Sequence, residues 1–301
     1  MQRLESIDAA RVWRRGQTGS VGFVPTMGAL HEGHLTLVRR SLAETNTTLV
    51  SIFINPLQFG AGEDLDRYPR DLEADLRELE EAGAPAVFIP STEIMYPSGF
   101  DTVVEVQGPL TQRLEAEHRP THFRGVTTVV TKLMQVGMAD RTYFGMKDAQ
   151  QILVLAKLVR DLAIPTTIVP VPTVREADGL ALSSRNVYLD EQHRTAASAI
   201  SLALHATTER FGEGERSADV LRAVAHAILD AEPLIDVQYV SCASIDTLEE
   251  LEGIEATALV SIAAMAGETH LIDNHWLGLP DGLDAPHVDL ALLPPALRSD
   301  P

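Results

Sequence analysis

Short apolar runs alternate with helical patterns along the first half of the chain, and no other feature of the sequence constrains the fold as strongly. Runs rich in β-branched and apolar residues predict strands, at Ser20–Pro25, Thr47–Ile54, Ala86–Ile89, Thr142–Phe144 and Thr166–Val171. Apolar residues at helical spacing predict helices between them, near His34–Leu42, Asp71–Ala82, Val126–Val136 and Ala149–Leu162. Strands separated by helices pair in parallel through right-handed crossovers. The sequence therefore predicts an α/β protein whose first domain is a doubly wound parallel sheet.

The pattern changes after Pro172–Asn186, a segment typical of a hinge. Two helices and then three strand-like runs are predicted beyond it, at Glu191–Phe211, Ala218–Ala231, Val237–Ser241, Ala256–Ala264 and Thr269–Ile272. This order is typical of a smaller α+β domain. The expected organisation is a larger domain over residues 1–173, an α+β domain over residues 174–279 and an irregular tail over residues 280–301.

Acidic residues outnumber basic ones, 43 to 24, which gives a formal net charge of −19. Such a surface repels nucleic-acid phosphates and anionic membranes, so we expect neither as a partner. Cys242 is the only cysteine, which rules out an intrachain disulfide and indicates a reducing compartment. The first residues mix charges and lack an apolar leader segment. We therefore expect a cytoplasmic protein with small-molecule partners.

Polar clusters follow four of the predicted strands. In an open α/β sheet, ligands bind outside the carboxyl ends of the strands, so four clusters at four such ends predict one shared site. The clusters are Pro25–His34, Asn55–Phe59, Phe144–Gln151 and Leu182–Asn186.

The first cluster places His31 and His34 at the start of a predicted helix, with Gly33 between them. Residues at this spacing share a helix face, and a helix N-terminus offers free N–H groups and the positive end of its dipole. Glycine lets the backbone approach a phosphate closely. The pair can therefore donate hydrogen bonds to a polyphosphate. The spacing differs from the H-E-x-x-H signature of zinc sites.

The chain lacks both the P-loop and the G-x-G-x-x-G fingerprint, so other groups must hold a triphosphate. Lys147 and Arg185 are the candidate cations, helped by the hydroxyls of Ser183 and Ser184. The alternative for the Ser183–Asn186 segment is an ordinary polar turn or helix cap.

Gln58 and Gln151 lie beside apolar residues and suit a ligand with hydroxyls and a carboxylate on a branched aliphatic body. The alternative for each glutamine is a solvent-facing amide, and this is what we expect of Gln150. His122, in a tight polar loop before a helix, is a further candidate.

Taken in order, these clusters resemble those of the pantothenate synthetases, a family of the nucleotidyltransferase superfamily with the H-x-G-H motif. The resemblance is dense from Ser20 to Leu189 and looser beyond. The matching segments are Val24–His34, Asn55–Phe59, Tyr68–Arg70, Arg119–Phe123, Gly145–Gln151 and Ser183–Asn186.

The resemblance implies a Rossmann-like nucleotidyltransferase domain that binds ATP and pantoate, a C-terminal domain that acts as a lid, and a homodimer. It also implies a Mg²⁺ ion on the ATP phosphates, with its protein ligands undefined. Gln58 and Gln151 would hold pantoate, and His34 would be the proton donor. The implied ATP contacts are Pro25, Met27, Gly28, Ala29, Leu30, His31, Glu32, Gly33, His34, Gly145, Met146, Lys147, Asp148, Val174, Leu182, Ser183, Ser184 and Arg185.

The implied reaction condenses D-pantoate with β-alanine through a pantoyl-adenylate and releases AMP and pyrophosphate. Its catalytic set comprises His34, His31, Lys147, Arg185, Ser183 and Ser184. Two alternatives remain open: another small-molecule nucleotidyltransferase of the same superfamily, or a catalytically impaired nucleotide-binding homologue. The two glutamines disfavour a phosphorylated acceptor, which would call for additional Arg or Lys.

Three positions depart from the family pattern. Met146 stands where glutamate is usual, Leu182 where methionine is usual, and Ala116 where glycine is common. Leu182 is a volume-conserving change. Met146 removes a carboxylate beside Lys147 and is the only feature that favours an impaired homologue.

Overall fold

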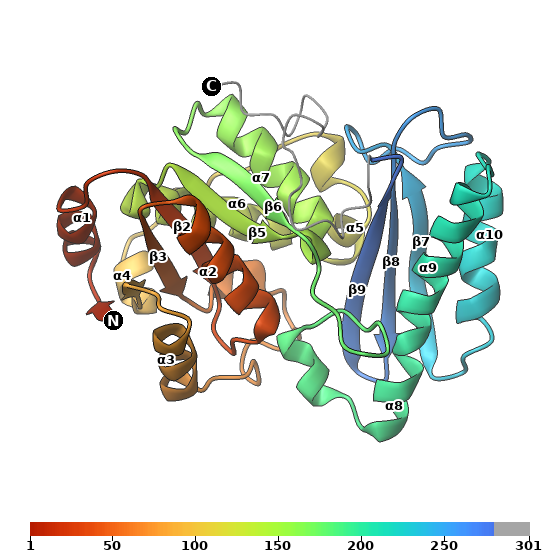
Figure 1. Cartoon of the computed structure of the whole chain (residues 1–301), viewed down its shortest axis with the longest axis horizontal. Coiled ribbons are helices and arrows are strands. Elements are labelled where there is room, and N and C mark those ends of the chain that lie inside the picture. Colours follow the sequence, from red (N-terminus) through yellow and green to blue (C-terminus); the bar gives the residue numbers. More distant parts are fainter. Residues whose placement is uncertain (280–301) are drawn as a thin grey trace.

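Two sheets of different kinds organise the protein in the computed structural model, which describes residues 1–279 (Figure 1). The first is a six-stranded sheet of order β1-β4-β3-β2-β5-β6, in which every pairing is parallel. The second has the order β7-β8-β9 and is antiparallel. This confirms the predicted fold class, a doubly wound parallel sheet with a smaller α+β part. The exact domain boundaries stay predictions, and the predicted tail lies outside the described residues.

The parallel sheet reverses its strand order between β2 and β5, which are neighbours in the sheet. From β2 the chain adds strands on one side, and from β5 it adds β6 on the other. In doubly wound sheets this switch point opens a crevice at the carboxyl ends of the strands. The strands are β1 (Gln2–Leu4), β2 (Val21–Thr26), β3 (Thr47–Ile52), β4 (Ala86–Phe88), β5 (Arg141–Gly145) and β6 (Thr167–Val171).

Helices cover both faces of the parallel sheet. Phe23 and Leu49 join the apolar core on one face, whereas the next residues along the same strands, Val24 and Val50, join the core on the other. This alternation follows from the two-residue period of a strand and explains why the strands are apolar throughout. One face packs against α1 (Ile7–Arg15), α6 (His122–Gly137) and α7 (Ala149–Asp161), and the other against α2 (Glu32–Glu44) and α3 (Leu72–Glu81).

Short elements follow the strand ends and connect the main helices. They are η1 (Pro56–Gln58), α4 (Thr92–Met95), η2 (Pro109–Thr111), α5 (Glu115–His118), η3 (Met146–Asp148) and η4 (Ser184–Tyr188). Three of them, η1, η3 and η4, lie in the polar clusters found in the sequence.

The antiparallel sheet is covered by helices on one face and contacts the first domain with the other. Helices α9 and α10 share a core with β7, β8 and β9. On the opposite face, Leu259 and Trp276 join the core of the parallel sheet. The elements are α8 (Glu191–Ala196), α9 (Ser198–Gly212), α10 (Ala218–Leu229), β7 (Ile235–Ala243), β8 (Ala258–Ala266) and β9 (Thr269–Leu277). Within residues 1–279, no helix combines the length and apolarity needed to cross a bilayer.

Candidate active site

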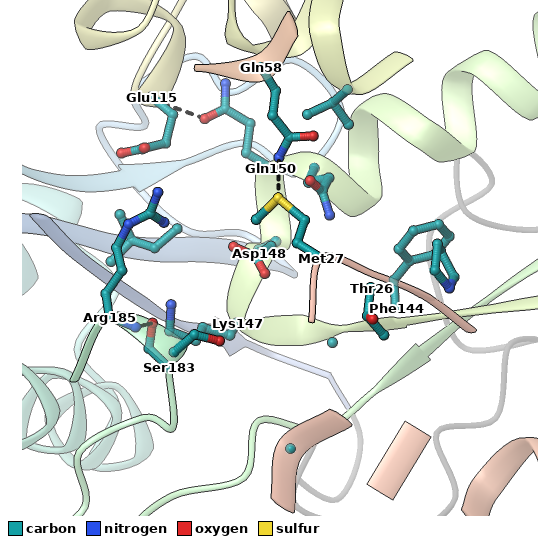
Figure 2. A pocket seen from close by; sticks show the side chains of 18 of the residues that line it. Thr26, Met27, Gln58, Glu115, Phe144, Lys147, Asp148, Gln150, Ser183 and Arg185 are labelled. Carbon is teal, nitrogen blue, oxygen red and sulfur yellow. Dashed lines mark hydrogen bonds between the residues drawn. The ribbon is translucent and has the colours of Figure 1, made fainter. Parts of the chain in front are cut away.

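A cavity opens at the carboxyl ends of β2 and β5, where the strand order reverses, and β9 contributes to its wall. All four predicted polar clusters supply residues to it, as Figure 2 shows in part. The predicted site residues that line the cavity are Pro25, Met27, His31, Gly33, His34, Gln58, Gly145, Lys147, Asp148, Gln151, Val174, Leu182, Ser183, Ser184 and Arg185.

The remaining predicted ATP contacts lie beside the cavity lining rather than in it, namely Gly28, Ala29, Leu30, Glu32 and Met146. The buried carboxylate of Asp75 on α3 accepts hydrogen bonds from the backbone N–H groups of Ala29 (3.0 Å) and Leu30 (2.7 Å). These two donors are therefore already occupied by a protein anion. Asp75 fixes the turn that leads from β2 to His31.

Met146 is buried in the apolar core to which α6 and α7 also contribute, with 2% of its surface exposed. Its neighbours Gly145 and Lys147 line the cavity, but its own side chain does not. The departure from the family's glutamate therefore changes the core rather than the cavity wall.

His31 and His34 pack against one another at the start of α2, with ring centroids 4.1 Å apart and ring planes tilted by 37°. His31 is the N-cap, and its Nδ1 accepts a hydrogen bond from the backbone N–H of Gly33 (3.2 Å). Because Nδ1 accepts, the neutral ring carries its proton on Nε2. Nδ1 of His34 is buried and has no hydrogen-bond partner within the described residues.

Both histidines are neutral at physiological pH. Burial, with the Lys147 charge second, lowers the pKa of His31 to about 4. Burial, followed by the charges of His31 and Lys147, lowers the pKa of His34 to about 3. A neutral imidazole can donate one hydrogen bond and accept another, so the pair offers donors without adding positive charge.

Lys147 and Arg185 approach the cavity from different elements. Lys147 lies in η3, between β5 and α7. Arg185 donates from Nε and Nη2 to the two carboxylate oxygens of Asp64, at 2.8 and 2.9 Å. Burial acts to raise the pKa of Asp64, but the hydrogen bonds and charge of Arg185 outweigh it and lower that pKa below its ordinary value.

The two serines before Arg185 have structural partners as well as a place in the cavity lining. The Ser183 hydroxyl caps η4 by accepting from the Arg185 backbone N–H (3.3 Å). The Ser184 hydroxyl donates to the carbonyl of Ala29 (3.0 Å) and so ties η4 to the turn after β2. The capping role considered from the sequence is thus correct for Ser183.

Gln58 is oriented by residues around η1. Its Oε1 accepts from Nδ2 of Asn55 (3.0 Å), and its Nε2 lies 3.3 Å from the sulfur of Met27 (Figure 2). Nδ1 of His122 is 2.9 Å from the Gln58 carbonyl. An apolar wall from α6 completes this side of the cavity, including Phe123, Val126, Val129, Val130 and Leu133.

Asn55 is a site residue to which sequence reasoning gave no role. It is buried, and its Oδ1 accepts from the hydroxyl of Tyr96 (2.6 Å) while its Nδ2 also reaches the carbonyl of Gly125 (3.1 Å). The Asn-Pro pair directly after a strand was the available signal. Such a pair indicates a residue in a turn, and it does not indicate that Asn55 orients the Gln58 side chain.

The expectation that Gln150 faces solvent is wrong. Only 7% of its surface is exposed, and its Oε1 accepts from the backbone N–H of Glu115 (3.1 Å). Its Nε2 donates to the carbonyls of Leu110 (2.9 Å) and Arg113 (2.8 Å). It connects α7 to the loop that carries Glu115, a contact that no local pattern reveals.

A second unpredicted group lies where α5 meets the antiparallel sheet. Glu115 is buried, and its Oε1 accepts from the hydroxyl of Tyr239 on β7 (3.1 Å). Nε2 of His270 on β9 is 3.6 Å from the same oxygen, and Arg119 is 3.9 Å from the other. Burial raises the pKa of Glu115, and burial, followed by the Arg119 charge, lowers that of His270 to about 4. Strands β7 and β9 carry no motif that would predict this placement.

Metal binding is constrained by the donor groups present. Within residues 1–279, no group of three or more His, Cys, Asp or Glu side chains could hold a metal ion. Asp148 supplies one carboxylate to the cavity lining. Mg²⁺ commonly binds substrate phosphates with only one or two protein carboxylates. The residues therefore fit an ion carried by a nucleotide, not an ion caged by protein.

Known proteins resemble the chain over nearly its whole length. The profile of the family described as pantoate-beta-alanine ligase matches residues 1–276. A pantothenate synthetase of Roseiflexus castenholzii is 52% identical over 274 residues, which cover 91% of this chain and 98% of that protein.

Solved structures agree with the sequence comparison. A pantothenate synthetase from Thermus thermophilus has a TM-score of 0.87 and 46% identity, covering 91% of this chain and 98% of that one. A pantoate-beta-alanine ligase from Francisella tularensis, complexed with beta-gamma ATP and beta-alanine, has a TM-score of 0.76 and 32% identity, covering 91% and 97%.

Proposed function

The chain belongs to the pantoate–β-alanine ligase family, and from this premise we propose how its cavity joins pantoate to β-alanine with ATP. The reaction has two steps, adenylation of the pantoate carboxylate and transfer of the pantoyl group to the amine. Neither step requires a protein nucleophile. Catalysis then depends on positioning the reactants and on stabilising the charge that moves between them.

In the first step, a carboxylate oxygen of pantoate attacks the α-phosphorus of ATP. The bond to the bridging oxygen breaks, and pyrophosphate leaves with its electron pair. Lys147 and Arg185 stabilise the charge on the phosphates, and His31 and His34 donate hydrogen bonds to them. Because the pKa of His34 is about 3 before ligands bind, its imidazole enters the reaction neutral and acts as an N–H donor.

Pantoate is held on the opposite side of the cavity. Gln58 and Gln151 bind its carboxylate and hydroxyl oxygens, and the apolar wall of α6 accommodates its branched aliphatic body. Asn55 sets the orientation of the Gln58 amide (3.0 Å). Asp148, at the edge of the same lining, is the proposed partner of the ATP ribose.

In the second step, the amine of β-alanine attacks the carbonyl carbon of the pantoyl-adenylate. The bond from that carbon to the phosphate oxygen breaks, AMP leaves, and the nitrogen loses a proton as the amide forms. Cys242 takes no part, because it is buried outside the cavity lining and burial raises its pKa to about 11. No covalent adduct of the protein should therefore survive denaturation in a mass spectrum.

Mg²⁺ bound to the ATP phosphates would supply charge neutralisation for the leaving pyrophosphate. Such an ion would be held mainly by the phosphates themselves, as Mg²⁺ commonly is in nucleotide sites. We also propose, from the family resemblance, a homodimer that works in the cytoplasm, where ATP is available.

The convergence of two neutral glutamines with the histidine pair and Lys147 on one cavity is the observation that carries this proposal. The test is AMP release by the purified protein with Mg-ATP, D-pantoate and β-alanine, omitting one component at a time. We expect AMP and pantothenate only when all three substrates are present. ATP consumption with a different acceptor would contradict the substrate assignment. ATP binding without AMP release would identify an impaired homologue.

A further inference from the structure

Strand β9 of the antiparallel sheet contributes two adjacent polar residues to the cavity lining, Asp273 and Asn274. Asn274 is 5% exposed, and its Nδ2 donates to the carbonyls of Met146 (2.9 Å) and Lys147 (2.8 Å). An amide nitrogen has two N–H groups, so both are used on the backbone of η3. The element that carries Lys147 is therefore held from the other domain.

These two bonds are the side-chain support that the structure shows for η3. Within the part of the chain that the structure describes, no side chain caps the N-terminus of η3, and Gly145 before it has open space where a Cβ would lie. A buried carbonyl that loses its hydrogen-bond donor is left desolvated and unpaired, which is unfavourable. Without Asn274, the backbone at Lys147 would shift toward another donor or toward water.

Asp273 extends the contact to the segment that carries Arg185. Both of its oxygens accept from the Arg175 guanidinium, at 2.5 and 3.1 Å, and Oδ1 also accepts from the Asn274 backbone N–H (2.8 Å). Arg175 starts a small hairpin, in which it pairs with Ala181. That hairpin leads directly into Ser183–Arg185.

The contacts therefore form one continuous path from the Lys147 backbone through β9 to the Arg185 hairpin. Lys147 and Arg185 lie on separate elements, which approach the cavity from different directions. Charge stabilisation of a transferring phosphoryl group requires both cations at fixed positions. Among the interactions shown for residues 1–279, only β9 contacts both elements through buried, hydrogen-bonded side chains.

We propose that Asn274 and Asp273 are positioning residues, which set the placement of Lys147 and Arg185 relative to one another for the adenylation step. This inference depends on the phosphate-binding roles given above to those two cations. A misplacement of about 1 Å at a reacting centre lowers the rate by about 100-fold. The loss should appear in kcat for adenylation rather than in the KM for pantoate, because no hydrogen bond shown for residues 1–279 joins Gln58 or Gln151 to Asn274 or Asp273.

The first test compares Asn274→Ala with the wild-type protein in pantoate-dependent exchange of labelled pyrophosphate into ATP. We expect a fall in exchange rate of about 100-fold, with the pantoate KM changed less than about threefold. Asn274→Ser is the second variant, in case alanine prevents folding. Asp273→Asn, which weakens the ion pair with Arg175, should raise the KM for ATP.

Thr207→Val is the matched control for loss of stability. Thr207 is fully buried on α9, and its hydroxyl donates to the Ala203 carbonyl (2.8 Å) away from the cavity. The control should lower the melting temperature and leave the exchange rate unchanged. If Asn274→Ala behaves in the same way, its role is structural and the proposal is wrong.

A double-mutant cycle separates an indirect effect from an independent one. If Asn274 acts through Lys147, then Asn274→Ala should change the exchange rate less than about threefold in a Lys147→Ala background. Losses that multiply in full would overturn the proposal. A wild-type protein that releases no AMP would instead contradict the proposed function, and Lys147→Ala at full activity would contradict the role of that lysine.

Discussion

At the scale of single residues, burial controls the charge of the two histidines that we propose as phosphate ligands, His31 and His34. The pKa values of His31 and His34 fall to about 4 and about 3 because water is excluded and Lys147 is near. The same imidazoles in an unfolded chain titrate near their ordinary pKa of 6.5. The site therefore keeps its histidines neutral over the whole physiological range, and the unfolded chain does not.

This difference makes stability depend on pH. Below about pH 6.5 the unfolded chain binds a proton at position 34 that the folded chain does not, so the free energy of unfolding falls as pH falls toward 3. Each such group contributes a slope approaching about 1.4 kcal/mol per pH unit. His34→Gln should reduce the slope of urea-unfolding stability between pH 6 and about pH 4.

The comparison of slopes matters because other groups titrate in the same range. Burial raises the pKa of Glu115 and of Asp75, and these groups act in the opposite direction. His205→Gln, at an exposed position on α9, is the control for the replacement of a histidine by glutamine. Equal slopes in wild-type and His34→Gln proteins would contradict the buried neutral state.

Lys147 is the second residue whose contribution can be isolated. Lys147→Ala removes the positive charge that we propose to stabilise the phosphates, and loss of one such group lowers kcat by about 100- to 1000-fold. We expect this loss in single-turnover adenylation measured by rapid quench. A variant that is impaired only in pantoate KM would show that the lysine binds the acid rather than the phosphates.

At the scale of elements, the approach of α6 to η1 fixes the side of the cavity that we propose for pantoate. Gly125 makes this approach possible, because a Cβ there would lie 2.2 Å from the Leu57 carbonyl oxygen and 2.5 Å from the Gln58 nitrogen. The Gly125 carbonyl also accepts from Asn55. The position of Gln58 therefore depends on a residue with no side chain.

Gly125→Ala should push η1 away from α6 and displace Gln58. We expect the KM for pantoate to rise at least about tenfold and the unfolding free energy to fall by about 1–3 kcal/mol. Gly137→Ala, on the same helix, meets its nearest atoms at an ordinary 3.6 Å and is the control. Steady-state kinetics and chemical denaturation of both variants check the prediction, which fails if the two behave alike.

Elements were predictable where their pattern is local. Each predicted strand and helix corresponds to an observed one, although Glu191–Phe211 is divided near Ala197 into α8 and α9. Val126–Val136 is helical despite its Val and Thr content, because its apolar face packs against the sheet. Strand β1 and helix α1 were missed: β1 is three residues long, too short to show a period.

The same distinction holds in the site. The clusters after β2, β3 and β5 could be read as one site because parallel strands bring their ends together. The sequence could not assign Asn274, Tyr239 and His270 to this site. They lie on antiparallel strands of a second sheet, and no local pattern predicts how that sheet packs against the first domain. Gln150 was misjudged for a related reason, since its partners belong to a loop remote in sequence.

At the scale of the whole molecule, the protein has a net charge of −19. The ligand proposed for its cavity, ATP, is also strongly negative. Like charges on the surface oppose the compact state, and the local cations of the cavity attract phosphate. Both effects are electrostatic and both are screened by salt, with a Debye length near 10 Å at about 0.1 M. The surface repulsion lowers the stability of the fold, whereas the attraction in the cavity strengthens nucleotide binding.

Raising NaCl from about 0.02 to about 0.5 M should therefore increase the melting temperature and also increase the KM for ATP. Differential scanning fluorimetry and initial-rate assays across the same buffers check both trends. A series with an uncharged osmolyte is the control, because it should leave the KM for ATP unchanged. A KM that is independent of salt would contradict the electrostatic account of nucleotide binding.

The pairing of Arg185 with Asp64 has a consequence for which anions the cavity accepts. An incoming anion must compete with a carboxylate that is already bound through two hydrogen bonds. A small monovalent anion such as chloride or acetate offers no more than Asp64 does, whereas a triphosphate offers several charges at once. If Arg185 binds the phosphates as proposed, Asp64 therefore favours ligands that carry several negative charges over ligands that carry one. The same competition favours the release of AMP after pyrophosphate has left, because its single phosphate competes less well with Asp64 for Arg185.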